Sequence, residues 1–142
     1  MGLLTRISPS WALETRALVA ASLSHKPADW VGRVATVQAL GGTSFGFLDE
    51  EGRLAAALMF WPLGGGLEEL AMACAVRPHP ERYLPSAVAL TRLSLADRFD
   101  TGVRVIQARV LAGNRSGHRL ARLAGFVPAR EAEAIMLYEV RP

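Results

Sequence analysis

Hydrophobic positions along the first third of the chain recur at spacings that predict one strand and two helices. An apolar opening over residues 2–7 predicts a short strand. The pair Ser8–Pro9 then offers a helix cap followed by a proline suited to the first helical position, so a helix is predicted over residues 9–23. A second helix is predicted over residues 28–40, where a pair of glycines ends it.

The middle of the chain alternates in a way that is typical of strands. Three strands are predicted, over residues 43–49, 53–61 and 67–76. Turn residues separate them, Glu50–Glu51–Gly52 after the first and three consecutive glycines after the second. The three strands are therefore expected to form an antiparallel meander.

The closing part of the chain returns to an alternation of helices and strands. A helix is predicted over 81–99, a strand over 103–111, a helix over 114–124 and a last strand over 132–140. The complete order is strand, two helices, three strands, helix, strand, helix, strand. This order indicates an α/β (α+β) fold, with helices flanking one central, mixed and mostly antiparallel sheet.

The helix predicted over 114–124 has a distinct apolar face. Its pattern predicts that Leu120, Leu123 and Ala124 point inward. Gly125 follows directly and is expected to end the helix, because glycine adopts the left-handed conformation that closes helices.

Composition is that of an ordinary globular domain. The chain has 142 residues, of which 51% are hydrophobic and 20% charged, so residues 1–142 are expected to form a single domain. The lone Cys74 cannot form an internal disulfide or a cysteine-based zinc site, which favours a reducing, cytoplasmic setting. No apolar run approaches the length of a membrane span and no signal peptide is evident, so no membrane association is expected.

Charge is mildly basic and concentrated near the C-terminal end. The net charge is +3, and the most basic region holds arginines at positions 104, 109, 115, 119 and 122. These could attract an anionic small molecule, but nucleic-acid binding is disfavoured because no stacking aromatics lie among them. Histidine and cysteine occur at no metal-binding spacing, so no metal site is predicted.

The stretch from Val103 to Phe126, which covers the strand predicted over 103–111 and the helix predicted over 114–124, carries a motif. A strand ends at Asn114, a helix follows with Arg119 and Leu120, and Gly125–Phe126 closes it. This spacing, with the order of elements over nearly the whole chain, resembles the GNAT superfamily of acetyl-CoA-dependent N-acetyltransferases. The asparagine can cap the helix or bind a ligand amide, and the glycine lets the chain reverse so that the phenylalanine packs on the sheet.

The resemblance implies a site for acetyl-CoA, a co-substrate, at the end of the strand predicted over 67–76. The residues it places there are Cys74, Ala75, Val76, Arg82, Ser86, Ala87 and Asn114. The family's glycine-rich pyrophosphate loop is altered, since Leu84 and Ser86 stand at its glycines and Pro85 lacks an N–H donor. Arg82, with neighbouring basic side chains, could bind phosphate by charge instead; the alternative is that coenzyme A binding has been lost.

The groups for acid–base chemistry also depart from the family. Many members carry a tyrosine seven residues after the asparagine, where it protonates the departing thiolate, and this chain has Ala121. Glu69 is the candidate general base, on the strand where the family often has one, and His118 is a second candidate because its pKa is ordinarily near neutrality. Each could equally be a solvated surface side chain.

Two functions of different classes follow from the resemblance. One is an acyl-CoA-dependent N-acetyltransferase that acts on a primary amine, with the acyl-CoA and the amine as its partners. The other is a non-catalytic GNAT-fold binding or assembly protein, comparable with the internal virion proteins of some short-tailed phages. A homo-oligomer or an assembly partner could pair with the exposed last strand.

Overall fold

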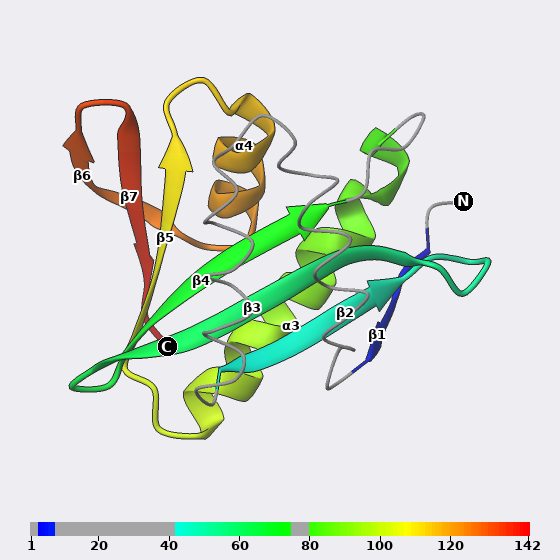
Figure 1. Cartoon of the computed structure of the whole chain (residues 1–142), viewed down its shortest axis with the longest axis horizontal. Coiled ribbons are helices and arrows are strands. Elements are labelled where there is room, and N and C mark those ends of the chain that lie inside the picture. Colours follow the sequence, from blue (N-terminus) through cyan, green and yellow to red (C-terminus); the bar gives the residue numbers. More distant parts are fainter. Residues whose placement is uncertain (1–2, 8–41, 75–79) are drawn as a thin grey trace.

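The computed structural model describes residues 3–7, 42–74 and 80–142, which form a seven-stranded sheet with two α-helices (Figure 1). The strands are β1 (Thr5–Ile7), β2 (Thr43–Leu48), β3 (Leu54–Gly64), β4 (Leu67–Cys74), β5 (Val105–Leu111), β6 (Val127–Ala132) and β7 (Ile135–Val140). The helices are a short 3₁₀ turn, η1 (Pro80–Tyr83), then α3 (Leu84–Asp100) and α4 (Arg115–Leu123). The helices predicted over 9–23 and 28–40 lie outside the described residues.

The strands lie in the order β1-β2-β3-β4-β5-β7-β6. Every neighbouring pair is antiparallel except β4 and β5, which are parallel and are connected through α3. The predicted α/β class, with a mixed and mostly antiparallel sheet, is therefore confirmed. None of the helices in the described part of the chain is long and apolar enough to cross a membrane.

The end of the chain differs from the prediction. Instead of one strand over 132–140, the structure has the hairpin of β6 and β7, joined by a turn in which Glu133 has a φ of 49°. Pro128 is the reason that the sequence did not predict β6, because proline is unusual inside strands. It is tolerated here because β6 is an edge strand, with a register shift between Pro128 and Arg130.

The helix faces are also corrected in one place. On α4 the buried residue is Ala121, and Ala124 is buried directly after the helix, whereas Leu123 is 41% exposed. The apolar character of Leu123 therefore misled the prediction, since the close approach of α4 to the sheet favours small side chains on its inner face. Gly125 follows with a φ of 102°, as its predicted role requires.

Both helices pack on the same face of the sheet. Arg98 of α3 contacts Glu68 of β4, and His118 of α4 contacts Tyr138 of β7; the register through β5 places Glu68 and Tyr138 on one face. The core lies between this face and the helices. Its largest buried members are Phe45, Phe47, Leu58, Phe60, Leu70, Leu95, Ile106, Phe126 and Tyr138.

Strand β1 is bound to α3 as well as to β2. The Ser86 hydroxyl accepts a hydrogen bond from the Leu4 backbone N–H at 2.9 Å. Farther along, Arg6 forms an ion pair with Asp97 at 2.5 Å and lies 4.7 Å from the centre of the Phe45 ring. The first contact holds the start of α3 against β1, and the Arg6–Asp97 pair holds the last part of the helix.

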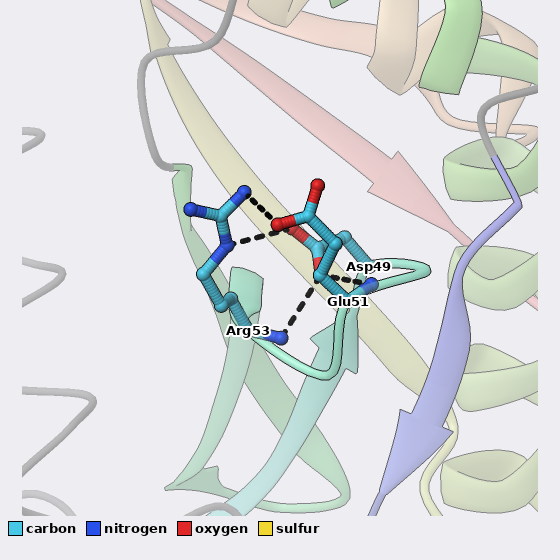
Figure 2. Close-up of polar contacts among 3 residues, drawn as sticks. All are labelled: Asp49, Glu51 and Arg53. Atoms are coloured by element: carbon cyan, nitrogen blue, oxygen red, sulfur yellow. Dashed lines mark hydrogen bonds and ion pairs between the residues drawn. The ribbon is translucent and has the colours of Figure 1, made fainter.

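The predicted turn between β2 and β3 is confirmed and is closed by side chains (Figure 2). Oδ1 of the buried Asp49 accepts hydrogen bonds from the backbone N–H groups of Glu51 and Arg53, both at 2.9 Å. Arg53 returns to form an ion pair with Glu51 at 2.6 Å. Gly52, with a φ of 77°, supplies the left-handed residue of the turn.

Candidate functional site

The parallel strands β4 and β5 separate along their length. They pair only at Leu67–Val105, Glu68–Ile106 and Glu69–Gln107, although β4 continues to Cys74 and β5 to Leu111. Figure 1 shows the two strands starting side by side near the β3–β4 turn and diverging from there. The divergence therefore begins directly after Glu69, the last residue of β4 that pairs with β5.

The divergence leaves one edge of β4 unpaired. Residues 70–74 remain paired with β3, but on the side of β5 they have no strand partner among the described residues. Backbone groups at such an edge can pair with an extended ligand that carries amide groups, as an added strand would. The pantetheine arm of coenzyme A is a ligand of this kind, so this part of the structure fits it.

The start of α3 offers less to a diphosphate. Pro85 lies in the first turn and lacks an N–H, and the N-cap residue Tyr83 makes no capping hydrogen bond through its side chain. Ser86 is engaged with Leu4, and Ala87 packs partly buried against the core. Arg82, which is expected to bind phosphate, is exposed.

The structure describes only some of the other residues expected to bind acetyl-CoA. Cys74 is the last residue of β4, whereas Ala75 and Val76 lie outside the described residues. Asn114 lies at the other side of the divergence, directly before α4. Its Oδ1 accepts a hydrogen bond from the Gly117 N–H at 3.0 Å, so the amide caps the helix.

His118 is engaged through both ring nitrogens. Nδ1 lies 2.8 Å from the hydroxyl of the fully buried Tyr138, and Nε2 lies 3.0 Å from the carbonyl oxygen of Leu111 and 3.2 Å from that of Ala112. Carbonyl oxygens only accept, so Nε2 carries the proton and, in neutral His118, Nδ1 accepts from Tyr138. This geometry makes His118 a link between α4, the end of β5 and β7.

Glu69 lies where β4 and β5 begin to separate, on the face of the sheet opposite α3 and α4. It is 8% exposed, and its Oε1 accepts hydrogen bonds from Arg109 Nε at 2.7 Å and from Gln107 Nε2 at 3.0 Å. Both partners come from β5: Gln107 stands directly opposite Glu69, and Arg109 is two residues farther along on the same face. The charge of Glu69 is thus balanced within the sheet.

The preceding residue, Glu68, points to the helix side. Its two carboxylate oxygens accept from Arg98 Nε at 2.9 Å and Nη2 at 2.7 Å, so the guanidinium binds the carboxylate through two parallel hydrogen bonds. The hydrogen bond to Glu68 raises the pKa of Arg98, outweighing the effect of burial, and keeps the guanidinium charged. This pair fixes β4 to α3 next to the point of divergence.

Sequence reasoning missed Gln107 and Arg109. The signal that could have found them is the alternation of the strand over 103–111, which places both residues on one face. Ala121, at the position where the resemblance implied a tyrosine, is buried and offers no hydroxyl. Within the described residues, no three histidine, cysteine, aspartate or glutamate side chains cluster as a metal site would require.

Comparison with solved structures supports the fold that this geometry indicates. An acetyltransferase of the GNAT family from Staphylococcus aureus superimposes with a TM-score of 0.74 at 11% identity, covering 97% of this chain and 98% of that one. The GNAT domain of S. lividans PAT gives 0.72 at 17% identity, with 98% and 89% covered. The ribosomal-protein-S5-alanine acetyltransferase of Vibrio fischeri gives 0.70 at 13% identity, with 97% and 91% covered.

These similarities establish the GNAT fold and confirm the resemblance in architecture. In sequence, the chain matches no family model and no curated protein. The identities to the solved structures are low, so the fold is what they share with this chain, and the chemistry has to be argued from its own residues.

Proposed function

We propose that this protein is an N-acetyltransferase that transfers an acetyl group from acetyl-CoA to a primary amine. The observation that carries the proposal is the divergence of β4 and β5 from Glu69 onward, which leaves the edge of residues 70–74 free to pair with an extended ligand. The GNAT fold supports it, since structures with this architecture include acetyltransferases.

The residues at the divergence divide the work between binding and proton transfer. When bound, acetyl-CoA supplies an acetyl group activated as a thioester. The free edge of β4 would hold and orient the arm, with Cys74 at its end and Asn114 on the other side. Ala75 and Val76, next in the sequence, are proposed to bind the arm as well. Arg82 would balance phosphate charge in place of a glycine loop.

Glu69 is the residue proposed to receive a proton from the amine, directly or through water. Its Oε1 is occupied by Gln107 and Arg109, so Oε2 is the oxygen that would serve. Ala121 supplies no acid for the departing thiol, and solvent is the proposed proton source there. His118, with both nitrogens engaged, would position the end of β5 instead of exchanging protons.

A second candidate is favoured by specific residues. Leu84, Pro85 and the engaged Ser86 leave the start of α3 poor in donors for a diphosphate, and Ala121 removes the usual acid. Both features are expected of a GNAT fold that has lost coenzyme A and serves as a binding or assembly protein.

Calorimetric titration with acetyl-CoA and, separately, with coenzyme A tests the first proposal against the second. We expect binding in the micromolar range, weakened by Arg82→Ala. Arg130→Ala is the matched control, because Arg130 is an exposed arginine on β6, an edge strand remote in the sheet order from β4. Folding of each variant is checked by circular dichroism.

The two candidates differ in the result. No heat of binding at millimolar ligand, from a protein shown to be folded, would reject the acetyltransferase and leave the binding or assembly protein. Binding accompanied by loss of the thioester absorbance in the presence of amines would support transfer. An equal loss of affinity in Arg82→Ala and Arg130→Ala would exclude a specific phosphate contact by Arg82.

A further inference from the structure

The two adjacent carboxylates Glu68 and Glu69 meet their arginines in different ways. The Glu68–Arg98 pair is closed, because both carboxylate oxygens bind nitrogens of the guanidinium. In the Glu69–Arg109 pair, Arg109 binds through Nε alone, and Gln107 donates to the same oxygen, Oε1. A carboxylate that accepts two hydrogen bonds at one oxygen can still accept hydrogen bonds at the other.

The Glu69–Arg109 pair leaves specific atoms without partners. Within the described part of the chain, neither Oε2 of Glu69 nor the two Nη nitrogens of Arg109 make a hydrogen bond. Among the described residues, the one side-chain polar atom that is both buried from solvent and without a hydrogen bond is Oγ1 of Thr91. Because Oε2 of Glu69 also has no hydrogen bond, it must be in contact with solvent. The Arg109 side chain is 53% exposed, and its terminal nitrogens are therefore accessible to a ligand.

The free atoms form an acceptor next to a set of donors. Oε2 of Glu69 can accept from an amine, and the Nη nitrogens of Arg109 can bind a carboxylate through paired hydrogen bonds. A molecule that carries an amine and a carboxylate on neighbouring atoms would satisfy both at once. The four groups would then alternate in charge, since each cation would lie between two anions.

We propose that the acceptor amine belongs to a free amino acid or a closely related amino carboxylate, with Arg109 binding its carboxylate and Glu69 its amino group. This inference rests on the proposed acetyl transfer and specifies its substrate class. The position of the pair, on the first residues where β4 and β5 separate, puts the amine at the start of the free β4 edge. Simple amines and polyamines lack the group that Arg109 would bind.

Matched pairs of acceptors test the proposal, each pair differing only in the carboxylate. Suitable pairs are L-leucine with 3-methylbutylamine, L-phenylalanine with 2-phenylethylamine, and L-histidine with histamine. We expect kcat/KM to be at least about tenfold higher for the amino acid in a pair that reacts, because loss of the carboxylate leaves the arginine donors unpaired. The whole set of standard amino acids is also screened by thermal shift in the presence of coenzyme A.

Variants at Arg109 separate binding from folding. Arg109→Gln should raise KM for the amino acid about tenfold or more and bring the ratio of kcat/KM between the amino acid and its matched amine close to one. Arg109→Lys keeps the charge but has a single nitrogen in place of the planar guanidinium, so it cannot form the paired hydrogen bonds to a carboxylate and should lose most of the preference too. Arg122→Gln, an exposed arginine of α4 on the opposite face of the sheet, is the control that should keep it. Thermal unfolding shows whether each variant is folded.

The outcomes distinguish the two levels of the proposal. If acetyl-CoA does not bind, the acetyltransferase itself is rejected and the inference falls with it. If acetyl-CoA binds but amines react equally well with and without a carboxylate, or no amino acid either binds or reacts, only the substrate class is overturned. A preference that survives in folded Arg109→Gln would likewise overturn the role of Arg109.

Discussion

The carboxylate of Glu68 and the guanidinium of Arg98 form two parallel hydrogen bonds, 2.9 and 2.7 Å long, between strand β4 and helix α3. Their side chains are 8% and 17% exposed, so both charges lie mostly away from solvent. A buried pair of this kind owes its stability to the presence of both partners, because each neutralises a charge that would be costly alone.

Removing one partner should therefore destabilise the protein more than removing both. We expect Glu68→Leu to lower the free energy of unfolding by about 3 kcal/mol, the low end for breaking a buried pair, since Arg98 is not fully buried. The double variant Glu68→Leu/Arg98→Leu should recover part of that loss. Urea unfolding of the wild type, Glu68→Leu, Arg98→Leu and the double variant measures these differences, and a double variant less stable than Glu68→Leu would contradict this account.

The Glu68–Arg98 pair also determines how this part of the protein's stability depends on pH. Glu68 raises the pKa of Arg98 above its ordinary, already very alkaline value. A raised pKa gives stability that is present below the unfolded-state value and is lost only as pH rises through the folded-state value. The stability lost in Arg98→Leu should therefore be the same at neutral and at mildly alkaline pH, as urea unfolding at both would show.

Position 117 requires glycine because of the neighbouring side chains and not because of its backbone conformation. A Cβ at this position would lie 2.6 Å from Asn114 Nδ2 and 2.9 Å from Val110 Cγ1. Alanine normally stabilises a helix relative to glycine by about 1 kcal/mol, but here it would displace the Asn114 cap and press on a buried valine. We expect Gly117→Ala to destabilise the protein by about 1–3 kcal/mol in thermal or urea unfolding.

Ser116→Ala is the matched control for Gly117→Ala. Ser116 is exposed on the same helix, so its replacement changes helix propensity without a steric conflict, and its effect should stay within about 0.5 kcal/mol. A Gly117→Ala protein as stable as the wild type would show that the start of α4 can move away from β5.

The contacts of His118 predict its tautomer. Because Nε2 faces the carbonyl oxygens of Leu111 and Ala112, neutral His118 should carry its proton on Nε2, with Nδ1 accepting from Tyr138. Nitrogen-15 NMR of the histidine rings distinguishes the two tautomers directly. A proton on Nδ1 would contradict the arrangement.

The Tyr138 hydroxyl should contribute measurably to stability through the same contact. Tyr138→Phe leaves Nδ1 of His118 without its donor, and we expect a loss of about 1–2 kcal/mol in unfolding free energy. Tyr83→Phe is the control, since the Tyr83 hydroxyl makes no hydrogen bond within the described residues and its loss should be nearly neutral. Equal effects of the two substitutions would remove the special role of Tyr138.

Local chemistry accounts for what the sequence predicted of the fold. Gly52 and Gly125 mark a turn and a helix end because their conformations are left-handed, and the asparagine before α4 caps it as expected. The hairpin of β6 and β7 was missed because Pro128 opposes a strand locally. Its place at the edge of the sheet, which makes the proline tolerable, depends on the whole topology.

The candidate site was less predictable because its contacts join distant parts of the chain. Glu69 was identified from its position on the strand, but its partner Arg109 is 40 residues away and is fixed by the parallel register of β4 and β5. His118 was expected to act on protons because histidine titrates near neutrality. The structure engages both its nitrogens, through Tyr138 on one side and the end of β5 on the other.

Thr91 gives a last prediction, because its hydroxyl opposes stability. The residue lies inside α3 and is 2% exposed, and its Oγ1 is the buried side-chain oxygen for which the described residues provide no partner. A buried hydroxyl without a hydrogen bond costs free energy, whereas valine has nearly the same shape and lacks the polar atom. We expect Thr91→Val to raise the free energy of unfolding by about 1 kcal/mol, and Thr91→Ala to lower it by opening a cavity. Urea unfolding of both variants decides the matter: a destabilised Thr91→Val would mean that the hydroxyl is hydrogen-bonded in solution.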